Sequence, residues 1–139
     1  MYLDSCVLAK LFITEPDSEA CVAKVTGSVI VSSELTYGEF FSVLLRKERE
    51  REISPPQREA LWAEFERQIR EESIFLAVLD GAIARKAKDV MLEVHPHVPL
   101  RTLDAIHLAT YLSVITGPLF TMDKRMRDAA RMLEIPLVE

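Results

Sequence analysis

Four acidic side chains are the residues of this sequence that could do chemistry together: Asp4, Glu39, Asp104 and Asp123. Carboxylates gathered within about 5 Å would repel by roughly 3 kcal/mol per ionised pair at an effective dielectric constant of about 20. Such a cluster persists only where protons or divalent cations offset the repulsion. Because all-oxygen ligands select hard ions, we expect Mg²⁺ or Mn²⁺ rather than zinc. One or two such ions can activate a water molecule and stabilise the leaving oxygen in phosphodiester cleavage.

Asp104 is the most informative of the four, because it lies in an apolar segment of helical character, residues 102–112. On a helix with about 3.6 residues per turn, Leu108, Tyr111 and Ile115 fall on the same side as this carboxylate. Burying a bare carboxylate costs several kcal/mol or neutralises the group. Asp104 is therefore expected to be paired, capped or bound to a metal ion.

Each of the four acids has both a functional and a structural interpretation. Asp4 and Asp123 each follow a predicted strand, where they could point into a ligand site or cap the next helix. Asp104 lies in the first turn of its helix, where the helix dipole could simply stabilise its negative charge. Glu39 lies away from the main apolar face of its helix, so the pattern permits a position at the rim of a cleft but does not require it.

Short apolar strands alternate with helices along the chain, which predicts an α/β fold with a parallel sheet. No internal linker is visible, so residues 1–139 are expected to form a single domain. The predicted strands are 2–3, 28–31, 74–78, 119–121 and 136–138. The first predicted helix runs from Asp4 to residues 11–13, and the others cover 18–25, 33–51, 55–71, 82–94, 102–112 and 123–133. Ser32–Ser33 are expected to cap the helix over 33–51, and residues 95–99 are expected to form a loop.

Composition excludes several classes of protein. Apolar residues make up 49% and charged residues 28% of the 139 residues, as in globular rather than disordered proteins. The net charge of −5 argues against a general polyanion-coating protein. No apolar run approaches a membrane span, and Cys6 and Cys21 lack metal-ligand spacing, so we expect a cytoplasmic protein. Nucleotide-binding glycine motifs and a hydrolase G-x-S-x-G elbow are absent from the sequence.

Several further residues could support an acidic site. Ser5 and Thr121 flank two of the acids and could hydrogen-bond a carboxylate or a metal-bound water, although capping is an equal alternative. His107 is more simply explained as a packed or hydrogen-bonded structural histidine than as a metal ligand. Candidates for contact with the phosphates of a nucleic acid are Lys10, Arg46, Arg49 and the Lys124–Arg125 pair; for Arg46 and Arg49 a solvated helix face is an equal alternative.

The acids lie in four motifs that occur in order along nearly the whole chain. Residues 2–11 (YLDSCVLAKL) contain Asp4, and residues 36–39 (TYGE) form a T-x-x-E stretch that ends at Glu39. Residues 101–109 (RTLDAIHLA) contain Asp104 in the pattern R-x-x-D-A-x-H-L-A, and residues 120–125 (FTMDKR) contain Asp123 in a T-x-D motif. Together these motifs resemble the PIN-domain ribonucleases of the VapC toxin type. Cys6 departs from the small hydroxyl residue that the family often has at this position.

The resemblance implies a PIN-like three-layer α/β/α fold with a central parallel sheet of about five strands. It also implies a Mg²⁺- or Mn²⁺-dependent endoribonuclease that forms homodimers and is inhibited by a small cognate antitoxin. In this hypothesis Asp4, Asp104 and Asp123 hold the ion, and Glu39 completes the cluster or positions water. Two alternatives remain open: a catalytically silent module that binds RNA or a protein, and a structure-specific DNA nuclease that uses the same acidic site.

Overall fold

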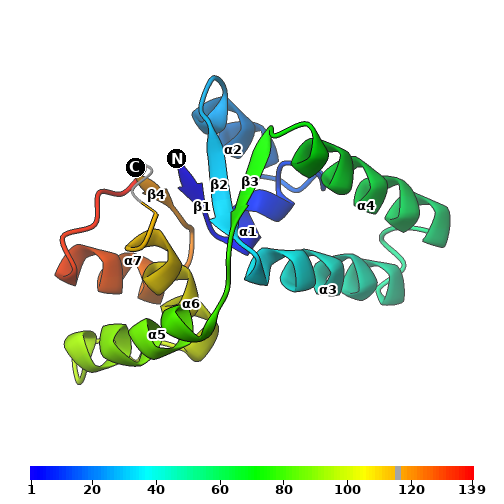
Figure 1. Cartoon of the computed structure of the whole chain (residues 1–139). Helices are drawn as coiled ribbons and strands as arrows, with labels where there is room; N and C mark the ends of the chain where they lie inside the picture. Colours follow the sequence, from blue (N-terminus) through cyan, green and yellow to red (C-terminus); the bar gives the residue numbers. More distant parts are fainter. Residues whose placement is uncertain (115–116) are drawn as a thin grey trace.

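The structure, a computed structural model, describes residues 1–114 and 117–139 (Figure 1). Ile115, predicted on the Asp104 side of its helix, lies outside the described residues. The strands are β1 (Tyr2–Leu3), β2 (Ile30–Ser33), β3 (Ile74–Ala77) and β4 (Leu119–Phe120). The helices are α1 (Ser5–Ala9), α2 (Ser18–Val25), α3 (Leu35–Arg49), α4 (Pro55–Arg70), α5 (Gly81–Val94), α6 (Thr102–Tyr111) and α7 (Lys124–Met132).

The described strands form a parallel sheet in the order β3-β2-β1-β4. Tyr2 pairs with Leu119, and Leu3 pairs with Phe120. Of the predicted last strand, Leu137 alone forms a parallel bridge, to Leu119, so the described sheet has four strands with this bridge where a fifth was expected. Successive strands run outward from β1 through β2 to β3, whereas β4 lies on the other side of β1. In open parallel sheets ligands bind at such a reversal, so a ligand crevice is expected beyond the carboxyl ends of β1 and β4.

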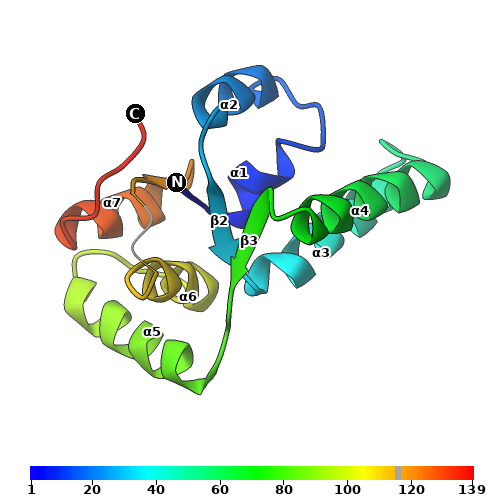
Figure 2. The same cartoon turned by 45° about the horizontal axis from the view of Figure 1, so that its top comes forward.

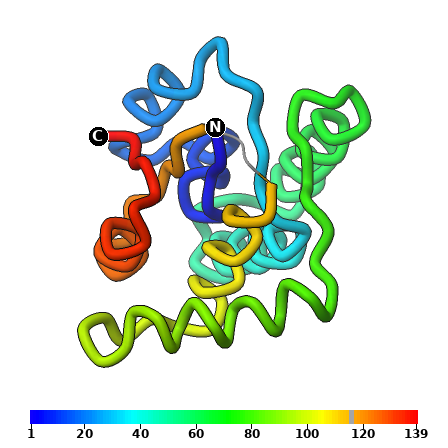
Figure 3. Tube along the Cα trace, turned by 60° about the vertical axis from the view of Figure 1, so that its left-hand side comes forward, coloured from blue at the N-terminus to red at the C-terminus, as the bar shows by residue number. Residues whose placement is uncertain are grey.

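Two hydrophobic cores, one on each face of the sheet, make the three layers. Because side chains alternate along a strand, Tyr2 and Leu119 join one core, and Leu3 and Phe120 join the other. The first core is built with α5, α6 and α7, and the second with α1, α2, α3 and α4. Figure 2 shows these two groups of helices on opposite sides of the strands. Figure 3 shows α5 and α6 side by side and both chain termini in the same region. The expected α/β/α arrangement is confirmed.

Most predicted helices are found within two residues of their expected ends, including α2 at residues 18–25. The clearest difference lies between β2 and α3. Ser32 and Ser33 were predicted to cap a helix but are the last residues of β2, and α3 begins at Leu35. The Ser32 hydroxyl donates to the carbonyl of Leu3 at 2.7 Å and lies 2.7 Å from the Thr36 hydroxyl. These bonds satisfy a serine inside the sheet, so the strand extends further than its apolar residues indicate.

The helix predicted to run from Asp4 to about Ile13 is also shorter than expected. It ends at Ala9, and the amides of Lys10, Leu11 and Phe12 bond carbonyls three residues back, at 3.1, 3.0 and 3.1 Å. This spacing belongs to tight turns rather than to an α-helix. The turn places the Phe12 ring 5.2 Å from the Phe40 ring, between centroids, so core packing takes precedence over helix continuation. Among the described helices, none combines the length and apolar character needed to cross a bilayer.

A group of ion pairs ties the loop after α1 to α3. The carboxylate of Glu15 accepts a hydrogen bond from the Lys10 ammonium at 2.7 Å. The same carboxylate lies 3.0 Å from the ammonium of Lys47. Lys10 also bonds Asp17 at 2.6 Å, and the largely buried Lys47 bonds Glu52 at 2.6 Å. Hydrogen bonds from Lys10 and Lys47 hold the pKa of Glu15 below its usual value despite partial burial.

We predict that Glu15→Gln lowers the free energy of unfolding by about 1–2 kcal/mol at neutral pH, because two charge-assisted contacts are weakened at a partly exposed site. Since the folded-state pKa of Glu15 is lowered, this stabilisation is present above the unfolded-state pKa of about 4.3. It is lost as the pH falls through the folded-state pKa. Urea denaturation should therefore show a difference from wild type that shrinks in acid. The exposed Glu19→Gln is the control, and an unchanged difference in acid would contradict the assignment.

Candidate active site

Asp4 begins the site, at the carboxyl end of the interior strand β1. It is 3% exposed and caps α1, with its Oδ1 accepting from the Val7 amide at 2.8 Å. Its Oδ2 accepts from the Thr121 hydroxyl at 2.5 Å. Burial raises the pKa of Asp4, and the bonds from Thr121 and Val7 oppose this. Both carboxylate oxygens are therefore held in fixed directions before any ligand binds.

Thr121 links the first acid to Asp123. While its hydroxyl donates to Asp4, the same oxygen accepts from the Asp123 amide at 3.1 Å. Asp123 caps α7 by accepting from the Met126 amide at 2.9 Å through Oδ1, and its Oδ2 lies 3.8 Å from the Arg125 guanidinium. The capping interpretation of Asp4 and Asp123 is thus confirmed. For Asp123 the cap uses Oδ1 and leaves Oδ2 in a weak ion pair.

Asp104 stands in the first turn of α6, half-buried, above the buried Leu108 and Tyr111. Among the described side chains, its Oδ2 is the buried oxygen that has no hydrogen-bond partner. Burial and the carboxylate of Asp123 raise the pKa of Asp104, against the opposing charges of Arg125 and Arg101. A buried acceptor without a partner costs about 1–3 kcal/mol, so this oxygen has reason to bind a cation.

Glu39 on α3 faces the site from the opposite layer of helices. Its Oε2 lies 2.9 Å from Nε2 of the buried His107 on α6. Burial tends to raise the pKa of Glu39, but hydrogen bonds from His107 and Ser5 lower it overall. The periodicity of α3 left the position of Glu39 open, and the contact with His107 turns its carboxylate inward. Ser5, considered as a supporting residue, contacts this acid rather than Asp4.

The charges of all four carboxylates act on one group, the thiol of Cys6. The thiol of Cys6, in the first turn of α1, has its pKa raised to about 11 by burial and by the charges of Asp4, Glu39, Asp123 and Asp104. Figure 2 shows α3 and α6, which carry Glu39 and Asp104, on opposite sides of the carboxyl end of β2. The four predicted acids therefore all lie near the start of α1, which follows the carboxyl end of β1.

The donor set suits a hard divalent cation, because every donor is a carboxylate oxygen. Oδ2 of Asp104 is buried without another partner, which also fits a cation. In the part of the chain that the structure describes, no three His, Cys, Asp or Glu side chains are already grouped to hold one ion. Protein contacts engage both oxygens of Asp4, Oε2 of Glu39 and Oδ1 of Asp123.

The basic residues considered for RNA contact fall into two groups. The Lys10 ammonium is already balanced by Glu15 and Asp17, which weighs against a phosphate contact. Arg46, Arg49 and Lys124 are exposed, and none of them has an ion pair within the described residues.

Sequence reasoning missed two contributors to the site. Tyr2, inside β1, has its hydroxyl 3.0 Å from Nδ1 of His107. His107 itself was predicted to be a structural histidine, and its burial and two hydrogen bonds agree with this, but one of those bonds holds an acid of the site. A tyrosine in a buried strand was the available signal, because its hydroxyl needs a polar partner.

Known proteins share this sequence pattern and fold. The family profile described as PIN domain matches residues 1–132. Ribonuclease VapC46 of Mycobacterium tuberculosis is 37% identical over 143 residues, which cover 99% of this chain and 95% of VapC46. The crystal structure of M. tuberculosis VapC20, a sarcin-ricin loop cleaving toxin, matches with a TM-score of 0.67 over 92% of this chain and 93% of VapC20. That likeness, at 14% identity, concerns the fold. The chain therefore belongs to the PIN-domain family and is of the VapC type.

Proposed function

We propose that this protein is a metal-dependent endoribonuclease and the toxin of a toxin–antitoxin pair. The observation that carries the proposal is the buried oxygen of Asp104 left without a partner, in a chain whose four predicted acids all lie close enough to Cys6 to raise its pKa. Like charges are kept together in this way where a divalent cation offsets their repulsion. The 37% identity to a protein named as a ribonuclease supports RNA as the substrate.

Each acid has a distinct part in this proposal. Asp4, Asp104 and Asp123 hold the ion, and Glu39 completes the cluster or positions the attacking water. Mg²⁺ or Mn²⁺, when bound, lowers the pKa of a coordinated water and offsets the charge that develops on the phosphate. Thr121 fixes the direction of the Asp4 carboxylate, and Ser5 supports Glu39.

The exposed cations offer a path for the RNA backbone. Arg46 and Arg49 extend from the same helix as Glu39, and Lys124 follows Asp123 directly. In a protein of net charge −5, such local cations are needed to attract a polyanion to an acidic crevice.

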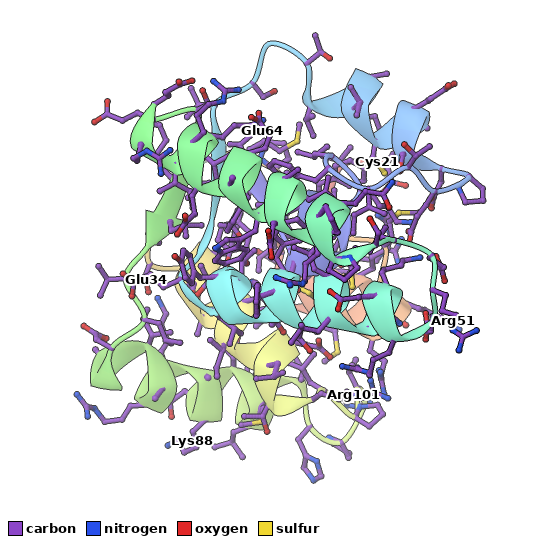
Figure 4. All side chains as sticks on the ribbon, turned by 90° about the vertical axis from the view of Figure 1, so that its right-hand side faces the viewer. Cys21, Glu34, Arg51, Glu64, Lys88 and Arg101 are labelled. Carbon is purple, nitrogen blue, oxygen red and sulfur yellow. The ribbon has the colours of Figure 1, made fainter. Side chains whose placement is uncertain are left out.

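The proposal includes the partners expected of a VapC-type toxin. Residues 1–139 act as one PIN-like domain, the working form is a homodimer, and a small cognate antitoxin inhibits it. The antitoxin contact is proposed near α4, whose apolar side packs in the second core. Figure 4 shows α4 beside α3 on one side of the molecule.

We predict that Asp104→Asn lowers RNA cleavage by at least about 100-fold without lowering thermal stability. The amide removes a partly buried charge whose pKa is already raised by Asp123, so the metal-free fold loses a repulsion. Cleavage of labelled RNA and thermal unfolding are the two measurements.

The exposed Asp89→Asn on α5 is the control and should cleave like wild type. Cleavage by Asp104→Asn at the wild-type rate would overturn the site assignment. Labelled DNA of the same sequence should remain intact; preferential cleavage of DNA would replace the ribonuclease proposal with the DNA-nuclease alternative.

We predict that Mn²⁺ binds the metal-free protein and raises its melting temperature. At about 100 times the dissociation constant, binding adds about 2.7 kcal/mol, or roughly 5–10 °C for a chain of this size. EDTA should stop cleavage, and Mn²⁺ or Mg²⁺ should restore it. Asp104→Asn should lose most of the thermal shift. An equal shift in wild type and Asp104→Asn would mean that the ion binds elsewhere.

A further inference from the structure

A buried line of polar atoms runs from the middle layer to the acidic crevice. The hydroxyl of Tyr2 lies 3.0 Å from Nδ1 of His107, and Nε2 of the same ring lies 2.9 Å from Oε2 of Glu39. Tyr2 is fully buried and His107 is 2% exposed. The line therefore connects three elements, β1, α6 and α3, through a single imidazole ring.

The chemistry of the end groups sets the direction of these bonds. An ionised carboxylate only accepts hydrogen bonds, so Nε2 of His107 must carry a proton and donate to Glu39. With a single ring proton on Nε2, Nδ1 accepts from the Tyr2 hydroxyl, which burial keeps protonated by raising its pKa. Tyr2 thus fixes the tautomer that presents an N–H to the acid.

Glu39 needs such a partner to face inward. Its carboxylate and that of Asp4 repel each other across the crevice, and Glu39 is half-buried on a helix with solvent close by. A glutamate has several rotatable bonds, so without the His107 contact the repulsion favours turning the carboxylate outward. The remaining contact to Ser5 is a neutral hydrogen bond.

We propose that His107, oriented by Tyr2, is a positioning residue that keeps the carboxylate of Glu39 aimed into the acidic crevice. This inference rests on the proposed nuclease function. His107 does not touch the reacting atoms; it acts through Glu39 alone. Tyr2 acts one step further back, through the ring.

The test is a double-mutant cycle on steady-state RNA cleavage. His107→Ala should lower kcat by about 10–100-fold and leave KM for RNA nearly unchanged. His107→Gln, whose amide can still donate to Glu39, should recover part of the loss, and Tyr2→Phe should cost less than His107→Ala. In a Glu39→Gln background, His107→Ala should have no further effect. Undiminished cleavage by His107→Ala, or a full additional loss in the Glu39→Gln background, would overturn the inference.

A second measurement does not depend on cleavage. ¹⁵N imidazole shifts of the metal-free protein should show His107 with its proton on Nε2, and Glu39→Gln should perturb that signal. A proton on Nδ1 alone would overturn the inference. Val90→Ala shortens a core side chain of α5, in the same helical layer as His107. It is the matched control for lost packing and should keep wild-type kcat. A wild-type protein that cleaves no RNA would overturn the proposed function itself, whereas active wild type with additive losses overturns the positioning role alone.

Discussion

The burial of the Asp4 charge is the constraint on which the rest of the site depends. A carboxylate with 3% exposure survives at the end of an interior strand because a threonine hydroxyl and a helix amide both bond it. The hydroxyl belongs to Thr121, which arrives there because Leu3 and Phe120 are paired in register. A slip of one residue between β1 and β4 would remove that bond and turn Thr121 to the other face. Strand register, helix caps and the position of Asp123 are therefore set together.

The two helical layers contribute to the site in different ways. The sheet edge supplies Asp4 and Asp123, each fixed as a cap. The layer of α6 supplies Asp104, whose unpartnered oxygen makes it the acid with the most to gain from a cation. The layer of α3 supplies Glu39, which a histidine from the α6 layer holds. Each acid is thus stabilised by a different neighbour, and their mutual repulsion remains available to favour metal binding.

The sequence predicts the parts of this arrangement that depend on local pattern. Apolar strands followed by an acid locate Asp4 and Asp123, and an acid in an apolar helix locates Asp104. The partner of Glu39 could not be predicted, because His107 lies 68 positions away and helix periodicity carries no information about another helix. For the same reason Ser32 was assigned to a cap, since its bond to the Leu3 carbonyl forms only when the strands meet. The sequence also predicts a last strand at residues 136–138, where Leu137 alone forms a bridge, because a run of apolar residues does not show how many of them pair with a neighbouring strand.

Glu39 and Asp104 lie in opposite helical layers. The hydrogen bond between His107 of α6 and Glu39 of α3 joins the two layers. The separation of these two acids is therefore set by how the two layers pack on the sheet. A molecule that binds only the outer surface of α3 and α4, the pair seen side by side in Figure 4, contacts the helix that carries Glu39 without touching the four acids.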